Sequence, residues 1–271
     1  MKLPIRSFLT ASPEKVLLEF DFSQAEAWVV AYLANCREMK AALVRKGDKD
    51  IHSTSGRALF SIPEDAPISS DARYMGKKFN HASNYGTSPM MIAHMVNSES
   101  INPPYTTITI AQAKTYHQRW KDLFHEIPRW WLDIQRELSD SRTLKTPYGR
   151  ERVFYGQWGD SLFKEAYAYI PQSTVADHCL GAVQPEVGIK GGIRGIFKEF
   201  VKGRISSGRP EIALLNTSHD SLILECPNSI SKEVQETCVN LLQRPLQIGG
   251  ETFTIPVDCK IGHAWGELEK C

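Results

Sequence analysis

The sequence predicts an α+β fold, in which an antiparallel sheet carries two acidic residues and helices form most of the remaining chain. Residues 16–22 form a short, largely apolar run, which predicts a buried strand. Residues 71–86 and 111–140 have the composition and length of helices. Two apolar runs, at residues 212–215 and 222–224, flank a polar centre, which predicts a β-hairpin.

Length and composition allow one large hydrophobic core or two smaller ones, since 42% of the 271 residues are hydrophobic. The net charge is +1, from 32 basic and 31 acidic residues, so it gives no sign of a nucleic-acid partner and any basic surface must be local. The six cysteines are widely spaced without a Cys-x-x-Cys pair, which favours reduced thiols over a zinc site or a disulfide framework. No apolar run reaches the ~18 residues that a membrane helix needs, so we expect a soluble, unsecreted protein without a membrane partner.

The first predicted strand ends beside Asp21, and the chain continues DFSQAE. Ser23 precedes Glu26 by three residues, which has the form of a capping box and predicts a helix from Ser23 to about residue 43. A carboxylate held at a strand end, beside the start of a helix, is well placed for cation chemistry. The pattern alone nevertheless favours an ordinary strand–turn–helix with a structural cap.

A row of functional side chains is predicted on the helix that reads DARYMGKKFNHASNYG. Arg73, Lys77, His81 and Tyr85 recur every four residues, so they form one ridge, about 18 Å long, on a single face. Gly86 after Tyr85 is a natural helix C-cap. The structural alternative is a solvated cationic face.

The stretch RTLKTPYGRERVFYG predicts two short strands joined by a turn at Tyr148 and Gly149. Its cations, Arg150 among them, either line a phosphate backbone or coat a solvated hairpin, and the residues alone leave both interpretations open. The aromatic side chains of residues 111–140 are expected in the core rather than stacked on bases.

Residues 164–180 contain Gln172, which the residues alone do not single out. The glycine-rich, basic segment at residues 186–210 is expected to be a flexible loop or a basic arm, to which we assign no role.

The polar centre of the predicted hairpin holds His219 and Asp220. An aspartate in a turn is usually explained by turn chemistry. Because both flanking runs are apolar, we expect two buried strands that tie the tip of the hairpin to the sheet that carries Asp21.

Taken together, these motifs resemble those of family A DNA polymerases, of the bacterial DNA polymerase I type and phage-like. The resemblance rests on DFSQAE after an apolar strand, on GDKDIHSTSGRALF, on the Arg–Lys–His–Tyr-Gly ridge, on the helix with Gln172, and on the His-Asp hairpin. It covers nearly the whole chain. Two positions depart from the family pattern: His81 stands where the best-known members have Phe or Tyr, and Ser221 stands where they have Glu.

The resemblance implies a palm with an antiparallel sheet that carries the catalytic carboxylates, and a mostly helical fingers subdomain. The palm is expected at residues 1–45 and 136–271, and the fingers at residues 46–135. Thumb and exonuclease domains are expected to be absent, so the chain is expected to be the C-terminal piece of a split or truncated enzyme, with an N-terminal polymerase fragment that carries the thumb as its partner. The expected location is the cytoplasm of a bacterium or the cytosol of a virus-infected host.

The implied activity is template-directed DNA synthesis, in which a dNTP is joined to a primer 3′-hydroxyl on a primer–template DNA. The implied cofactor is a pair of Mg²⁺ ions held by Asp21, Asp220 and the Phe22 carbonyl, with Lys77 as the acid that protonates pyrophosphate. The implied nucleotide-binding residues are Gln24, Glu26, His52, Arg73, Lys77, His81 and Tyr85. The implied DNA-binding residues are Arg150, Gln172 and His219.

Two other functions compete with this interpretation. The first is a non-catalytic nucleic-acid-binding or assembly subunit, with a degenerate palm kept as a scaffold. The second is a single-subunit RNA polymerase, whose usual first motif lacks the Ser-Gln-x-Glu arrangement. Incorporation assays with dNTPs and rNTPs separate the three.

Overall fold

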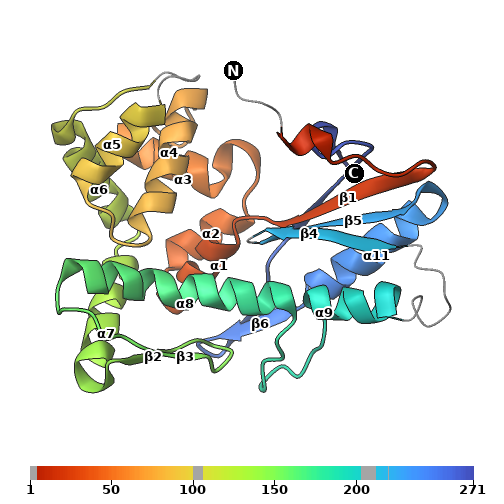
Figure 1. Ribbon diagram of the computed structural model, residues 1–271. Helices are drawn as coiled ribbons and strands as arrows, with labels where there is room; N and C mark the ends of the chain where they lie inside the picture. Colours follow the sequence, from red (N-terminus) through yellow and green to blue (C-terminus); the bar gives the residue numbers. More distant parts are fainter. Residues whose placement is uncertain (1–4, 100–105, 203–211, 219) are drawn as a thin grey trace. The chain divides into compact units, whose positions relative to one another are not determined.

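The computed structural model describes residues 5–99, 106–202, 212–218 and 220–271, and it confirms the α+β class (Figure 1). The chain divides into two compact units, which we describe separately. The sheet unit consists of Met1–Ala25, Pro147–Gly149 and Ser173–Cys271. The helical unit consists of Glu26–Thr146 and Arg150–Gln172.

The sheet unit is built on a five-stranded antiparallel sheet with the strand order β4-β5-β1-β8-β9. Its strands are β1 (Lys15–Phe22), β4 (Ala213–Ser218), β5 (Ser221–Pro227), β8 (Val257–Gly262) and β9 (Glu269–Lys270). Helix α11 (Ser231–Leu242) packs on β1, β5 and β8 (Figure 1). The unit also contains α9 (Gly192–Ile196) and the hairpin of β6 (Pro245–Ile248) and β7 (Glu251–Thr254).

Strand β1 lies at the centre of this sheet because it is apolar on both faces. Leu17, Leu18 and Phe20 are buried, as expected for a strand covered on two sides. Helix α11 buries Val234 and Cys238, four residues apart and hence on one side of the helix. The central position fixes the register of Asp21 with its two neighbouring strands.

The helical unit holds most of the helices. They are α1 (Ala25–Leu33), α2 (Arg37–Val44), α3 (Ile51–Phe60), α4 (Ser70–Ser83), α5 (Pro89–Glu99), α6 (Ile110–Leu123), α7 (Glu126–Ser141) and the first part of α8 (Asp160–Leu180), with a hairpin of β2 (Thr143–Lys145) and β3 (Glu151–Val153). Helix α3 packs on α4 and α6, and α5 also packs on both. The expected core position of the aromatic residues is confirmed, because Trp120, Phe124, Trp130 and Trp131 are all buried. Among the described residues, no helix is both long and apolar enough to cross a bilayer.

The predicted first helix is wrong in its start and in its length. It begins at Ala25 rather than Ser23, because Gln24 is left-handed with φ of 57°, so the proposed capping box does not form. It ends after Leu33, where Asn35 has φ of 48° and the Cys36 N–H donates to the Ala31 carbonyl. This is a Schellman ending, in which asparagine can replace glycine.

One further helical prediction is refined by the structure, and two differ from it. The stretch predicted to be helical over residues 111–140 consists of two helices, α6 and α7, and Pro128 lies in the first turn of α7, where proline is tolerated. Helix α4 ends at Ser83, so Tyr85 and Gly86 lie in the turn that follows it. Residues 192–202 are helical rather than loop-like, and residues 203–210 of that basic segment lie outside the described residues.

The predicted hairpin is present as β4 and β5, but only one of its strands is buried. Leu222, Ile223 and Leu224 of β5 are buried, whereas Asn216 to Ser218 of β4 are exposed at the sheet edge. An edge strand packs against one neighbour only, which explains the polar residues in this part of β4.

Helix α4 is held against α3 by two glycines whose backbones nearly touch. A Cβ on Gly76 would lie 2.1 Å from the His52 carbonyl oxygen and 2.6 Å from the Gly56 nitrogen. Helix propensity favours Gly76→Ala by ~1 kcal/mol, but these are backbone atoms that cannot move aside. We therefore expect Gly76→Ala to lower the free energy of unfolding by about 3 kcal/mol in urea denaturation.

The matched control is Gly195→Ala, where a Cβ would meet only the flexible end of Leu241 at 3.3 Å. This variant should stay within about 1 kcal/mol of the parent. Equal stability of the two variants would contradict the close packing of α3 and α4.

Candidate active site

Two acidic residues meet at the ends of adjacent strands in the sheet unit. Asp21 is the next-to-last residue of β1, and Asp220 immediately precedes β5. Asp21 pairs with Ser221 in the ladder, and the Phe22 N–H donates to the Asp220 carbonyl at 3.1 Å. The antiparallel register thus brings together residues that are nearly 200 positions apart in the chain.

The environment of Asp21 disfavours its charged form. Burial, then the negative charge of Asp220, and then that of Glu19 raise the pKa of Asp21 from 3.8 to about 6, while Lys260 opposes the change. Perturbed carboxylates of this kind gather at functional sites. A nearby cation would remove the repulsion, because an opposite charge favours the ionised form.

The donors at this place are of the type that Mg²⁺ prefers. Carboxylate and carbonyl oxygens are hard ligands, and Mg²⁺ is commonly held by one or two carboxylates together with substrate phosphates. Within the part of the chain that the structure describes, no cluster of three or more His, Cys, Asp or Glu side chains could hold a metal. The two carboxylates are therefore donors of the right type, but by themselves they supply only part of a coordination shell.

Three polar side chains, His178, Tyr148 and Arg244, form a hydrogen-bonded cluster beside Phe22 at the end of β1. The Phe22 ring packs edge-on against the His178 ring, with centroids 5.5 Å apart. Nδ1 of His178 is hydrogen-bonded to the Tyr148 hydroxyl at 2.7 Å, and Arg244 donates to the same hydroxyl at 3.2 Å. Burial lowers the pKa of His178 to about 3, so the imidazole is neutral. No motif in the sequence indicated this support, because its members lie far apart in the chain.

The predicted ridge is present on α4 in the helical unit. Arg73, Lys77 and His81 are all exposed on one face, and Tyr85 follows in the turn after the helix. Arg73 forms an ion pair with Asp50, the N-cap of α3. The neighbouring Lys78 instead pairs with Glu99, so it points to a different part of the unit.

His52 lies under this ridge, and its hydrogen bonds fix its tautomer. Its ring centroid is 6.2 Å from that of His81. The Asn80 Oδ1 accepts from Ser55 at 2.7 Å and from Trp120 at 2.8 Å, so the Asn80 amide nitrogen is the donor to His52 Nδ1. The proton of a neutral His52 is therefore on Nε2.

The charge state of His52 follows from its burial. The side chain is 7% exposed, and burial, with smaller effects of Arg73, His81 and Lys77, lowers its pKa to about 4. At neutral pH the ring is thus uncharged, and it can act as a hydrogen-bond donor through Nε2. Asn80, which sets this arrangement, was not predicted, since a single asparagine within a helix carries no sequence signal.

Glu26 and Tyr85 meet although they are 59 positions apart. The Tyr85 hydroxyl donates to the Glu26 carboxylate at 2.5 Å. Burial and the charge of Glu26 raise the pKa of Tyr85 well above 10, which keeps the phenol protonated as the donor. Glu26 therefore holds the aromatic side chain at the end of α4 rather than capping α1.

The remaining predicted site residues have varied surroundings. Gln24 occupies the left-handed turn before α1, and its Oε1 is buried without a partner among the described residues. Arg150 is exposed at the β2–β3 turn, and Gln172 is exposed on α8. His219 lies outside the described residues, and Ser221 bonds through its hydroxyl to the Ser218 carbonyl at 3.0 Å.

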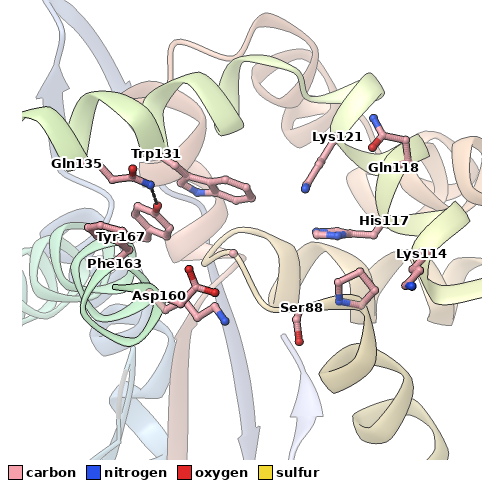
Figure 2. Close-up of a pocket in the computed structure, with 13 residues that line it drawn as sticks. Ser88, Lys114, His117, Gln118, Lys121, Trp131, Gln135, Asp160, Phe163 and Tyr167 are labelled. Atoms are coloured by element: carbon pink, nitrogen blue, oxygen red, sulfur yellow. Dashed lines mark hydrogen bonds between the residues drawn. The ribbon is translucent and has the colours of Figure 1, made fainter. Parts of the chain in front are cut away.

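The helical unit also contains a cavity of about 420 Å³ between α6, α7 and α8 (Figure 2). Its lining includes Lys114, Lys121 and Lys164, with Asp160 as a counter-charge. His117 projects into it, and the Nε2 of this buried side chain has no partner among the described residues (Figure 2). The cavity is therefore lined by more cationic than anionic side chains.

Comparison with known proteins agrees with the motifs. The family model "DNA polymerase family A" matches residues 1–267. The chain is 24% identical to DNA polymerase I of Helicobacter pylori, and the match covers 97% of this chain and 26% of the relative. It is 22% identical to the DNA polymerase of Escherichia phage T5, and that match covers 98% of this chain and 33% of the relative. The chain thus spans about a quarter to a third of the length of these curated relatives.

A solved structure shares the fold. It is the POL domain of Pol1 from M. smegmatis in complex with a DNA primer–template and a dNTP. The TM-score is 0.73 and the sequence identity is 18%, and the match covers 97% of this chain and 42% of the other chain. The resemblance predicted from the motifs is confirmed over nearly the whole sequence. The chain belongs to DNA polymerase family A.

Proposed function

We propose that the chain carries the catalytic and nucleotide-binding parts of a DNA polymerase, which joins a dNTP to a primer 3′-hydroxyl on a DNA template. The observation that carries this proposal is the pair Asp21 and Asp220 on adjacent strand ends, with the pKa of Asp21 raised by burial and by Asp220. Family membership supplies the reaction class, and the M. smegmatis relative binds primer–template and dNTP.

The proposed metal ligands are Asp21, Asp220 and the Phe22 carbonyl. Two Mg²⁺ ions, when bound, would lower the pKa of the primer hydroxyl and neutralise the charge of the departing pyrophosphate. The role of the protein is to hold these oxygens in a fixed position. The packing of the Phe22 ring against the buried His178 ring contributes to this rigidity.

The exposed face of α4 is the proposed triphosphate site. Arg73 presents a guanidinium fork to phosphate oxygens, and Lys77 presents a compact charge that can also protonate the leaving pyrophosphate. His52, neutral and protonated on Nε2, donates a hydrogen bond to a phosphate rather than adding charge. Gln24, His81 and Tyr85 complete the proposed nucleotide contacts.

The proposed DNA contacts lie in both units. Gln172 is assigned to the minor groove, where correct base pairs present acceptors at equivalent places, and Arg150 and His219 to the primer–template. The lysines around the cavity of Figure 2 offer further contacts to a nucleic-acid phosphate. In this assignment residues 1–45 and 136–271 are palm, and residues 46–135 are fingers.

Glu26 is the proposed determinant of sugar selectivity, because its carboxylate would crowd a ribose 2′-hydroxyl. We expect Glu26→Ala to reduce the preference for dNTP over rNTP by roughly 100-fold, measured as the ratio of kcat/KM values. Tyr85→Phe also removes the hydrogen bond between the two residues, but leaves the carboxylate in place. This control should therefore keep most of the selectivity, and an equal loss in both variants would contradict the steric role of Glu26.

We further propose that extension requires an additional polymerase segment that carries a thumb, on the same polypeptide or on a partner. The test is a Mg²⁺-dependent primer-extension assay with and without an N-terminal polymerase fragment. Stimulation by the fragment supports the proposal, and processive synthesis by residues 1–271 alone would overturn it.

A further inference from the structure

A pair of cysteines in the sheet unit is placed for covalent bonding. Cys259 lies in β8, and Cys271 follows β9. The register of these two strands pairs Lys260 with Lys270 and Ile261 with Glu269, so the next pair is Cys259 and Cys271. The Cys271 N–H donates to the Cys259 carbonyl at 3.0 Å, and the two sulfur atoms are 3.3 Å apart.

The strand pairing agrees with the backbone separation that a disulfide requires. Residues that exchange backbone hydrogen bonds in an antiparallel ladder have Cα atoms about 5.5 Å apart, which lies inside the range that disulfides span. The sulfur atoms lie 3.3 Å apart, so they must approach by about 1.3 Å to reach the length of a disulfide bond. Among the described cysteines, no other pair has its sulfur atoms in contact.

We propose that Cys259 and Cys271 form a reversible intramolecular disulfide that attaches the last strand to the sheet. The proposal is independent of polymerase activity. Its oxidant is a small disulfide such as oxidised glutathione.

The exchange balances in two steps. The thiolate of Cys271 attacks oxidised glutathione, which forms a mixed disulfide and releases one glutathione thiolate. The sulfur of Cys259 then attacks the sulfur of Cys271 and releases the second glutathione. The two protein thiols lose two electrons and two protons, and one oxidised glutathione becomes two reduced molecules.

The order of the steps follows from exposure. Cys271 is exposed, whereas Cys259 is 6% exposed. Burial raises the pKa of the Cys259 thiol far above its usual value, and the contact with Cys271 raises it further. Cys271 therefore meets the oxidant first, and Cys259 acts as the resolving thiol.

The disulfide would fix β9 against β8, the strand that pairs with β1 at Asp21. Lys270, one residue before Cys271, forms an ion pair with Asp258 at 2.6 Å, and Asp258 is the ladder partner of Asp21. A disulfide that fixes β9 therefore keeps Lys270 beside Asp258 on the strand next to the carboxylate pair.

The test uses the full chain, purified reduced and then incubated with oxidised or reduced glutathione. After alkylation and non-reducing digestion, mass spectrometry should find the Cys259 and Cys271 peptides joined, about 2 Da lighter than the two thiol peptides combined. Dithiothreitol should restore both thiols. Amide exchange in β9 should be at least about 10-fold slower in the oxidised protein.

The matched control is Cys271→Ser, which changes an exposed side chain and should leave no intramolecular cross-link. Two outcomes would overturn the proposal. One is that Cys271 ends as a stable glutathione adduct or an intermolecular dimer. The other is that both thiols remain alkylatable in excess oxidised glutathione.

Discussion

Asp21→Asn is expected to abolish primer extension, by at least about 1,000-fold, while the folded protein becomes more stable. Asparagine keeps the shape of the side chain but removes the anionic oxygen that the proposed Mg²⁺ site requires. It also removes the repulsion that Asp21 experiences from Asp220 and Glu19. Loss of activity with a gain in stability distinguishes a functional acid from a structural one.

The gain in stability depends on pH in a defined direction. The pKa of Asp21 is raised to about 6 in the folded state, so between about pH 4 and pH 6 the folded protein retains a proton that the unfolded chain has lost. The contribution of Asp21 to the free energy of unfolding is therefore most favourable below about pH 4, and this contribution is lost as the pH rises through 6. Allowing for solvent screening of a half-buried side chain, we expect the variant to be more stable by about 1 kcal/mol at pH 7.5 without metal.

The control for Asp21 is Asp258→Asn on the neighbouring strand. Asp258 is the ladder partner of Asp21, but its carboxylate is held by Lys270 at 2.6 Å. This variant should retain extension within about threefold. The assignment fails if Asp21→Asn stays active, or if both variants lose activity equally.

Lys77→Ala is expected to lower kcat for nucleotide incorporation by about 100- to 1,000-fold. Lys77 is proposed to stabilise the negative charge that develops on pyrophosphate in the transition state. Removal of one group that stabilises such charge typically lowers kcat by about 100- to 1,000-fold. Because the side chain is exposed, the free energy of unfolding should hardly change. Single-turnover incorporation and urea denaturation measure the two quantities.

The adjacent residue supplies the control for this variant. Lys78 has the same charge and lies on the same helix, but it pairs with Glu99 and contacts the Tyr74 ring at 5.4 Å. Lys78→Ala should therefore leave kcat nearly unchanged. Equal losses in the two variants would show that only the net charge of α4 matters, which contradicts a specific role for Lys77.

Local signals in the sequence were sufficient for much of the fold. The apolar run before Asp21 became the central strand, and the four-residue spacing of Arg73, Lys77 and His81 became an exposed face of α4. The strand follows from a short apolar run and the ridge from a helical repeat, and the sequence displays both directly. The hairpin around Asp220 is predicted from two further apolar runs.

Features that depend on distant contacts were missed. The break after Leu33 follows from a left-handed Asn35, and the capping box failed because Gln24 is left-handed and the Ser23 N–H bonds to Pro256. The partners of His52 and His178 come from other segments of the chain. Such contacts exist only after folding, so no pattern in the sequence indicated them.

The most direct measurement of the central claim is incorporation of a single dNTP opposite a defined template base, with the chain supplied together with an N-terminal polymerase fragment. One complementary addition is expected, which requires Mg²⁺ and is lost in both Asp21→Asn and Asp220→Asn. Primer–template binding without any Mg²⁺-dependent addition, whatever fragment is supplied, would contradict it and would favour a non-catalytic scaffold.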